Sequence, residues 1–304
     1  MSNANAPKVL YHYCSLSAFT SITSSKEIRL TDLLKSNDYL EGLWLYNAIV
    51  DTLDVMEDAK RQELPVLKSP EEYKLEESRN LLFSRFRQYV EDAQTIQTAN
   101  DAFYGFCLSE EKDLLSQWRG YADDGQGVAI GFSTEFLQSV CGSLSEGSYV
   151  CFNSIKYGSQ QLLQFLVDEM ASYTLLTTAP KGSTWPDEYT KLRLNIESIF
   201  FKNSSFKEEK EWRLVFRDQR NRGAESDSLH RFGKATISTR KWYARGNKLI
   251  PYHVLDYKDV PDAIQSIVIG PKCLIANDDM RNYLDDTGYD SKKIAIERSG
   301  SSYR

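Results

Sequence analysis

The stretch Ser116–Phe132 combines side chains of the kind that hold a nucleotide-like molecule. Arg119 offers a planar fork of donors that suits phosphate or carboxylate. Trp118 and Tyr121 offer flat faces against which a ring can pack. The glycines of the stretch let the backbone approach a ligand closely. Because the apolar run Val128–Phe132 follows directly, we expect a ligand-binding loop that leads into a buried strand.

The same stretch also fits a purely structural role. In a polar hairpin, Arg119 pairs with Asp123 or Asp124, and Trp118 fills the core. The residues alone leave both alternatives open.

His12 lies between two tyrosines in Tyr11–Tyr13, a short run typical of a strand. Successive side chains of a strand point to opposite faces, so His12 faces away from its two neighbours. A histidine ring donates from one nitrogen and accepts at the other, which suits a ribose hydroxyl. The alternative is a histidine whose hydrogen bonds are satisfied at a sheet edge.

Two glutamates, Glu209 and Glu211, lie two residues apart at the start of an apolar segment. If the strand begins by Glu209, both carboxylates point to one face, and Trp212 begins the buried face. Neighbouring carboxylates repel each other, which raises one pKa unless a cation is near. Such pairs occur in catalytic sites and also on solvated strand ends, and both alternatives stay open here.

The composition is that of a globular protein, with 41% apolar and 26% charged residues in a chain of 304. No apolar run approaches the roughly 20 residues that cross a bilayer, and the N-terminal residues lack the apolar segment of a secretory signal. The five cysteines form no Cys-x-x-Cys pair and there are only three histidines, so we expect no metal site. We therefore expect a cytoplasmic protein with reduced thiols and no membrane partner.

The net charge of −6 hides a basic segment. From Lys202 to Lys248 the sequence has thirteen Lys or Arg and six Asp or Glu, which leaves the rest of the chain strongly acidic. A local basic excess suits a phosphate-bearing partner, whether a nucleotide, a nucleic acid or an anionic surface. The alternative is a solvated surface. General DNA binding is disfavoured because the acidic remainder repels the phosphate backbone.

Hydrophobic periodicity predicts a single α+β domain over residues 1–304, with a mixed, mostly antiparallel sheet and a helical insertion at about 38–95. The expected strands are Val9–Tyr13, Glu27–Thr31, Phe103–Cys107, Gly127–Phe132, Tyr149–Tyr157, Glu211–Phe216, Ile250–Leu255, Ala263–Gly270 and Lys293–Ile296. The expected helices begin near Ser15 or Ser17, Ser36, Pro70, Glu111, Ser133, Ser159, Asp187 and Asn277, and the helix from Asp187 extends to about Lys202. A loop is expected at Arg217–Gly233.

A histidine strand, a loop with aromatic and arginine residues, and a Glu-x-Glu strand follow one another in this chain. This order resembles the mono-ADP-ribosyltransferase pattern. The resemblance implies an ADP-ribosyltransferase-like sheet core and NAD as the substrate. It also implies catalytic roles: His12 contacts a ribose, Glu211 stabilises the oxocarbenium-like transition state, and Glu209 positions or deprotonates the acceptor.

The same resemblance implies a set of NAD-binding residues. Arg119 would bind the pyrophosphate, and Tyr121 or Trp118 would stack on nicotinamide. The complete set comprises Arg119, Tyr121, Trp118, Ser116 and Tyr13.

Further motifs extend over nearly the whole chain. They are Tyr11–Ser15, Ser36–Asp38 with Glu41, Cys107-x-Ser109, Ser116–Tyr121, Gly127–Phe132, Phe206-x-x-Glu209-x-Glu211-Trp212-Arg213 and Ile269–Lys272. On these motifs the chain resembles a mostly bacterial family called domain of unknown function 2971. That family name supplies no activity.

We expect an NAD-dependent ADP-ribosyltransferase or NAD glycohydrolase, as a toxin or phage-defence effector. Its macromolecular acceptor is a protein or a nucleic acid that the sequence does not identify. One alternative is a non-catalytic sensor that binds a nucleotide or another phosphoryl ligand. Another is metal-dependent phosphoester hydrolysis, which needs Asp123, Asp124 and the glutamates to converge on one cation.

Overall fold

The computed structural model divides the chain into two compact units. The larger unit comprises Met1–Ser36, Ala102–Ile155 and Phe206–Arg304, and the smaller comprises Asn37–Asp101 and Lys156–Ser205. The expected insertion at about 38–95 lies within the smaller unit. The structure describes residues 6–35, 41–61, 84, 87–88, 90–91, 102–143, 148–158, 160–162, 164–166, 168, 193–218, 230–232 and 234–303.

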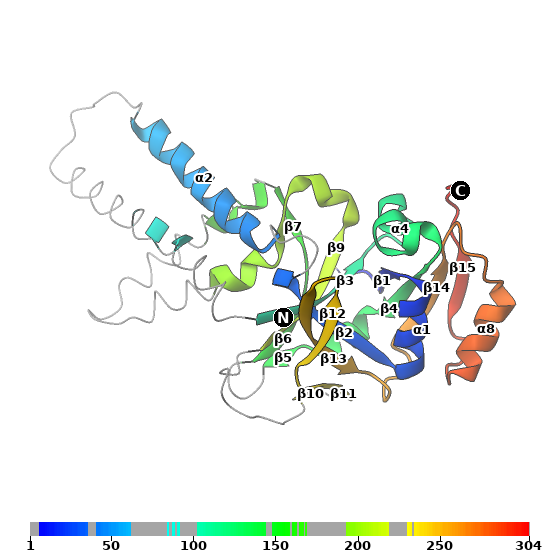
Figure 1. Ribbon diagram of the computed structural model, residues 1–304. Helices are drawn as coiled ribbons and strands as arrows, with labels where there is room; N and C mark the ends of the chain where they lie inside the picture. Colours follow the sequence, from blue (N-terminus) through cyan, green and yellow to red (C-terminus); the bar gives the residue numbers. More distant parts are fainter. Residues whose placement is uncertain are drawn as a thin grey trace. The chain divides into compact units, whose positions relative to one another are not determined.

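A large sheet forms the larger unit (Figure 1). Its main path runs β10 (His230–Phe232), β11 (Ala235–Ile237), β13 (Lys248–Asp256), β2 (Glu27–Asp32), β3 (Ala102–Ser109), β1 (Val9–Cys14), β4 (Val128–Ser133), β14 (Ile264–Ile269) and β15 (Ala295–Arg298). Its side branches are β12 (Lys241–Arg245) on β13, and β9 (Glu211–Asp218), β6 (Tyr149–Ser154) and β5 (Gly142–Ser143) beyond β3. Within the described part of this sheet only the β14–β15 pair is parallel, so the predicted mixed, mostly antiparallel sheet is confirmed.

The sheet forks at β3. Strand β9 pairs with β3 along its whole length, from Ala102 to Ser109. The other edge of β3 is therefore shared: β2 pairs near Tyr104 and Gly105, whereas β1 pairs at Ser109. The two arms of the sheet diverge from this point.

One face of the sheet carries the main core, covered by three helices. The helices are α1 (Leu16–Ser25), α5 (Thr134–Ser139) and α8 (Asn277–Asp286). Ser15 caps α1 by accepting from the Ala18 amide, and Ser133 caps α5 by accepting from the Phe136 amide. The structure thus selects Ser15 from the two expected starts of the first helix and confirms the start at Ser133. Alternation along β9 turns its apolar residues toward this core, namely Trp212, Leu214 and Phe216.

The opposite face carries a smaller cluster beneath a short helix. The helix is α4 (Leu115–Tyr121), followed by the 3-10 turn η2 (Asp123–Gly125). Trp118 of α4 packs against Tyr13, Ala129 and Val268, which lie in register across β1, β4 and β14. This face is the one that positions the candidate site.

The smaller unit has its own core around the helix α2 (Glu41–Arg61), beside the short parallel pair β7 (Lys156–Tyr157) and β8 (Phe201–Lys202). Buried Tyr46 donates to Asn195 at 2.6 Å. Its core residues are Leu45, Tyr46, Ile49, Leu53, Val90, Leu162, Phe165, Leu166, Leu194 and Phe201. In the described chain no helix is both long and apolar enough to cross a membrane.

The structure corrects several predicted elements. The helix expected to reach Lys202 ends earlier, because Phe201 and Lys202 pair as β8. The loop expected at Arg217–Gly233 begins later, since β9 continues to Asp218, and it contains β10. Strands β11 and β12 were not expected. Most of the helix expected from Pro70 lies outside the described residues.

Candidate functional site

His12 lies at the fork of the sheet. Its Nδ1 donates to the carbonyl oxygen of Cys107 at 2.9 Å, between the positions where β2 and β1 pair with β3. The ring packs against Phe106, with centroids 4.2 Å apart. Burial lowers the pKa of His12 to about 4, although the bond to Cys107 opposes this shift. The ring is therefore neutral at pH 7, with Nε2 as its acceptor.

Glu211 opens β9 as a buried, ion-paired carboxylate. Its Oε1 accepts from Arg213 Nε at 2.6 Å and its Oε2 from Arg213 Nη2 at 3.1 Å. The two side chains are only 8% and 3% exposed. This two-point bond fixes the orientation of the carboxylate.

Glu211 stands in a row with Ser109 and Tyr11, which are in register across β9, β3 and β1. Residues opposite one another in antiparallel strands share a face, so Tyr13, two residues from Tyr11, is on this face too. Because Trp118 packs on Tyr13, helix α4 covers the same face. The structure thus brings Glu211 and the Arg119-containing helix to one side of the sheet.

The structure does not bring His12 to that side. Alternation along β1 turns His12 away from Tyr11, toward Phe106 of the main core. His12 and Glu211 therefore belong to opposite faces of the sheet.

Glu209 is not part of strand β9. The predicted alignment of Glu209 and Glu211 required the strand to begin by Glu209, and it begins at Glu211. Glu209 ends the 3-10 helix η4 (Ser204–Glu209), and Lys210 has a left-handed φ of 42° before β9 begins at Glu211. Its backbone carbonyl accepts from Ser109 Oγ at 2.6 Å. This turn removes the alternation that would align the two carboxylates on one face.

Trp118 and Tyr13 have structural contacts. Trp118 is fully buried, and its ring meets Tyr13 edge-on at 4.7 Å. Tyr13 donates to the Glu111 carbonyl at 2.6 Å and accepts from the Leu114 amide at 3.0 Å. These contacts match the core-filling alternative for Trp118 and leave Tyr121, which is 53% exposed, as the accessible ring of α4.

Asp113 anchors this cluster to the C-terminal segment. It accepts from Trp118 Nε1 at 2.6 Å, Ser299 Oγ at 2.5 Å and the Gly300 amide at 2.7 Å. Burial raises the pKa of Asp113, but the hydrogen bonds outweigh burial and leave this pKa below its ordinary value.

Arg119 is exposed on α4, as is Ser116. The Arg119 guanidinium lies 5.8 Å from the centroid of the Tyr303 ring. Asp124 instead pairs with Lys272 at 2.8 Å and accepts from Tyr303 at 2.6 Å. Within the described chain Arg119 has no carboxylate at ion-pair distance, so the salt bridge considered for it belongs to Lys272.

The glycines after α4 serve backbone packing. A Cβ at Gly127 would lie 2.1 Å from the Cys14 carbonyl oxygen, and one at Gly270 would lie 2.5 Å from that of Gly125. Gly125 itself has a positive φ of 88°. The glycines were expected to let a ligand approach the backbone. In the structure the backbone of neighbouring segments occupies that space instead.

Residues 117–214 match a family model described as "Protein of unknown function (DUF2971)". The match covers most of α4, the whole of β4 and β6, and the start of β9 with Glu211 and Arg213, and it supports the resemblance to that family of unknown function. Comparisons with curated proteins and with solved structures found no match.

Arg213, Ser109 and Asp113 were not predicted as parts of this face. Arg213 was visible two residues after Glu211, a spacing that puts both on one face of a strand. Ser109 belongs to the motif Cys107-x-Ser109, but its role depends on strand register, and the role of Asp113 depends on the C-terminal segment, so neither role could be predicted from the sequence. Among the described residues no cluster of His, Cys, Asp and Glu is arranged to hold a metal ion.

Proposed function

We propose that this protein breaks the bond between nicotinamide and ribose in NAD and transfers ADP-ribose to an acceptor or to water. One observation carries the proposal: Glu211, fixed by Arg213, shares a face of the sheet with the helix that bears Arg119 and Tyr121. A cation and an exposed ring on that helix suit a pyrophosphate and an aromatic base.

In the proposed reaction one bond to C1′ of the ribose breaks and another forms. The C1′–N bond breaks, and its electron pair leaves with nicotinamide. The ribose becomes oxocarbenium-like, and the Glu211 carboxylate stabilises that charge more in the transition state than in the ground state. The acceptor nucleophile then bonds to C1′ and loses its proton to solvent. His12 acts here as a positioning residue that holds the fork of an ADP-ribosyltransferase-like sheet.

The acceptor is a macromolecule, protein or nucleic acid, within a bacterial cytoplasm, where the chain acts as a toxin or phage-defence effector. The five cysteines are scattered along the sequence and form no Cys-x-x-Cys pair, which supports a reducing compartment.

Nicotinamide release from NAD tests the proposal. We expect release by the native chain and its loss in Glu211→Gln, which keeps the shape of the side chain and removes its charge. Glu208→Gln is the matched control, because Glu208 is exposed on the same segment. Equal release by Glu211→Gln and the native chain, at equal melting temperatures, would contradict the assignment.

A second candidate is a sensor that binds a nucleotide or phosphoryl ligand without turnover. The exposed Arg119 beside Tyr303 and Lys272 favours it. It predicts that NAD or another nucleotide raises the melting temperature, that Arg119→Ala reduces the rise, and that no nicotinamide is released.

A further inference from the structure

The C-terminal part of the basic segment lies in one arm of the larger unit. Between Asp227 and Asp256 the sequence has six Lys or Arg and no carboxylate. The described part of this stretch forms β10, β11, β12 and β13, which lie beyond β2 in the sheet. Nothing in the proposed reaction uses these strands.

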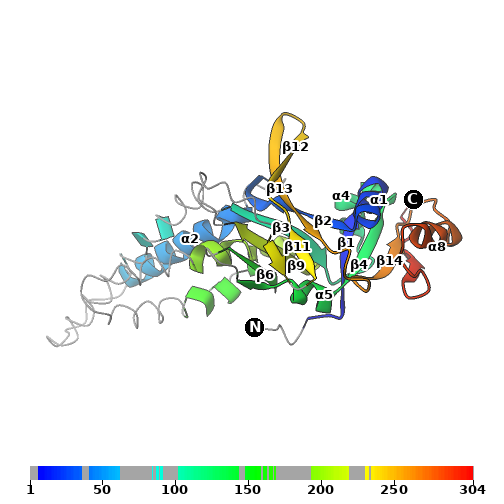
Figure 2. The same cartoon turned by 90° about the horizontal axis from the view of Figure 1, so that it is seen from below.

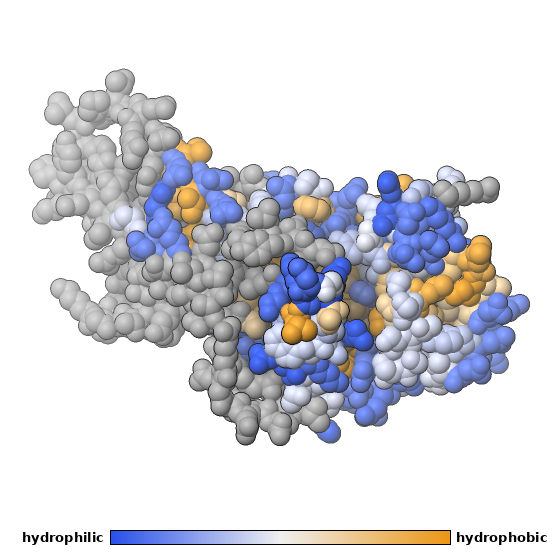
Figure 3. Space-filling model, viewed as in Figure 1, coloured by the Kyte–Doolittle hydropathy of each residue, from blue (hydrophilic) through white to orange (hydrophobic). Residues whose placement is uncertain are grey.

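Strands β12 and β13 form a hairpin that projects from the sheet (Figure 2). The turn is Gly246–Asn247, and Gly246 has a φ of 57°. Pairing of Arg245 with Lys248 and of Lys241 with Tyr252 puts three cations on one face of the hairpin. Figure 3 shows hydrophilic residues gathered around this projection, with a small hydrophobic spot among them.

Aromatic rings accompany the cations. Tyr243 and Tyr252 lie on the cationic face, with ring centroids 5.6 Å apart, and Arg29 lies 5.3 Å from the Tyr252 ring. On the other face Trp242 is 51% exposed and Leu249 is 66% exposed. Trp242 has cations of its own, because Lys35 and Arg240 each lie 5.5 Å from its ring centroid. Rings that lie beside cations are the arrangement on which bases stack while phosphates are neutralised.

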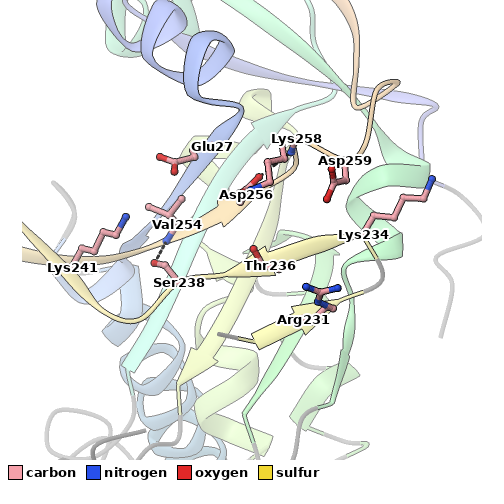
Figure 4. Close-up of a pocket in the computed structure, with 10 residues that line it drawn as sticks. All are labelled: Glu27, Arg231, Lys234, Thr236, Ser238, Lys241, Val254, Asp256, Lys258 and Asp259. Atoms are coloured by element: carbon pink, nitrogen blue, oxygen red, sulfur yellow. Dashed lines mark hydrogen bonds and ion pairs between the residues drawn. The ribbon is translucent and has the colours of Figure 1, made fainter. Parts of the chain in front are cut away.

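The cationic face leads into a cavity of about 320 Å³ (Figure 4). Its floor is a row in register across four strands, Arg231 on β10, Thr236 on β11, Asp256 on β13 and Glu27 on β2. Lys241 lines one end and thereby joins the cavity to the hairpin. This volume lies in the range of small-molecule sites, about 300–1,000 Å³.

Charges in the cavity are only partly paired. Lys258 bonds Asp256 at 3.0 Å. Arg231, Lys234 and Lys241 have no ion pair in the described part of the chain. Three cations are thus available to phosphate, while Glu27 and Asp259 can accept from the amino groups of a base.

We propose that this cavity and the β12–β13 hairpin bind single-stranded nucleic acid. The phosphates lie along Lys241, Arg245 and Lys248, and one nucleotide enters the cavity. Bases stack on the half-buried tyrosines of that face and, across the edge strand β12, on the exposed Trp242. A single strand is favoured over a duplex because its unpaired bases reach both the rings and the cavity. Because the rest of the chain is acidic and repels phosphates, binding is limited to the hairpin and the cavity. The inference does not depend on NAD cleavage.

Fluorescence anisotropy with short labelled single-stranded RNA and DNA tests the inference. We expect binding that weakens as salt rises, and a roughly tenfold or greater loss in Lys241→Glu and in Trp242→Ala. Arg231→Ala tests the cavity separately and should weaken binding severalfold. Lys292→Glu is the control, an exposed charge reversal on a different part of the unit.

The side chains of Lys241 and Trp242 are exposed, so we expect these variants to keep the native melting temperature. The inference is overturned by unchanged affinity in both hairpin variants, or by no binding at low salt. It is equally overturned if duplex DNA or anionic phosphatidylserine vesicles bind and the single strands do not.

Discussion

At the scale of single residues, the candidate site depends on partners that hold side chains in place. Arg213 orients Glu211 through two hydrogen bonds, and Asp113 orients Trp118 through one. Of the residues predicted from sequence, Arg119 is exposed and Glu211 is a buried carboxylate paired with Arg213, whereas Trp118 and Tyr13 are core residues. Burial separates Arg119 from the core residues, but it does not separate Glu211, which differs from them by its charge.

Asp113→Ala should destabilise the larger unit. The substitution leaves the buried Trp118 indole N–H without its acceptor and frees Ser299 and the Gly300 amide. Loss of a partner for a buried donor costs about 1–3 kcal/mol. Urea unfolding measures this change, and a variant as stable as the native chain would show that Asp113 does not anchor the cluster.

His12 predicts a pH dependence of stability. Its pKa is about 4 in the folded chain and 6.5 ordinarily, so between these values the unfolded chain binds more protons. Stability therefore rises with pH across this window and is lost as pH falls from about 6.5 to about 4. His12→Asn keeps a donor for Cys107 but does not titrate.

The native chain and the His12→Asn variant can be compared by urea unfolding at about pH 7 and about pH 5. The native chain should lose more stability than His12→Asn over that interval, by on the order of 1 kcal/mol. Equal losses would mean that His12 is not buried as a neutral ring.

At the scale of elements, the turn after α4 is set by contacts between backbones. The strand β4 that follows Gly127 was predictable from its apolar run, as were β1, β3 and β9. The turn itself could not be predicted. Gly127 and Gly270 must lack a Cβ because each lies against backbone carbonyls of segments far away in sequence. The hairpin strand β12 was missed because its side chains are exposed on both faces and show no apolar period.

Two glycine substitutions test whether backbone crowding sets this turn. Gly127→Ala should destabilise by about 1–3 kcal/mol or more, since its Cβ would lie 2.1 Å from the Cys14 carbonyl oxygen. Gly120→Ala is the matched control, because Gly120 lies in α4 with no heavy atom within 4 Å of the added Cβ. It should stabilise by about 0.5–1 kcal/mol. Equal effects of the two changes in urea unfolding would contradict this account of the turn.

At the scale of the whole molecule, one forked sheet carries two separate surfaces. The arm that begins with β1 carries α4, and Glu211 on β9 is in register with the start of that arm. The arm that begins with β2 carries the basic hairpin and the cavity. Local sequence patterns predicted most strands of this sheet. These patterns could not predict the fork. The fork arises because β1 and β2 share one edge of β3, and strand pairing depends on contacts between segments far apart in sequence. That register also decided that His12 and Glu211 face opposite ways.

The most direct test of the proposed function separates transition-state stabilisation from binding at Glu211. It measures the maximal rate of nicotinamide release and the affinity for NAD in the native chain, in Glu211→Gln and in the control Glu208→Gln. We predict that Glu211→Gln lowers the rate by about 10²–10³-fold and leaves NAD affinity within a few-fold, as expected for a charge that acts in the transition state. An unchanged rate in Glu211→Gln would contradict the account.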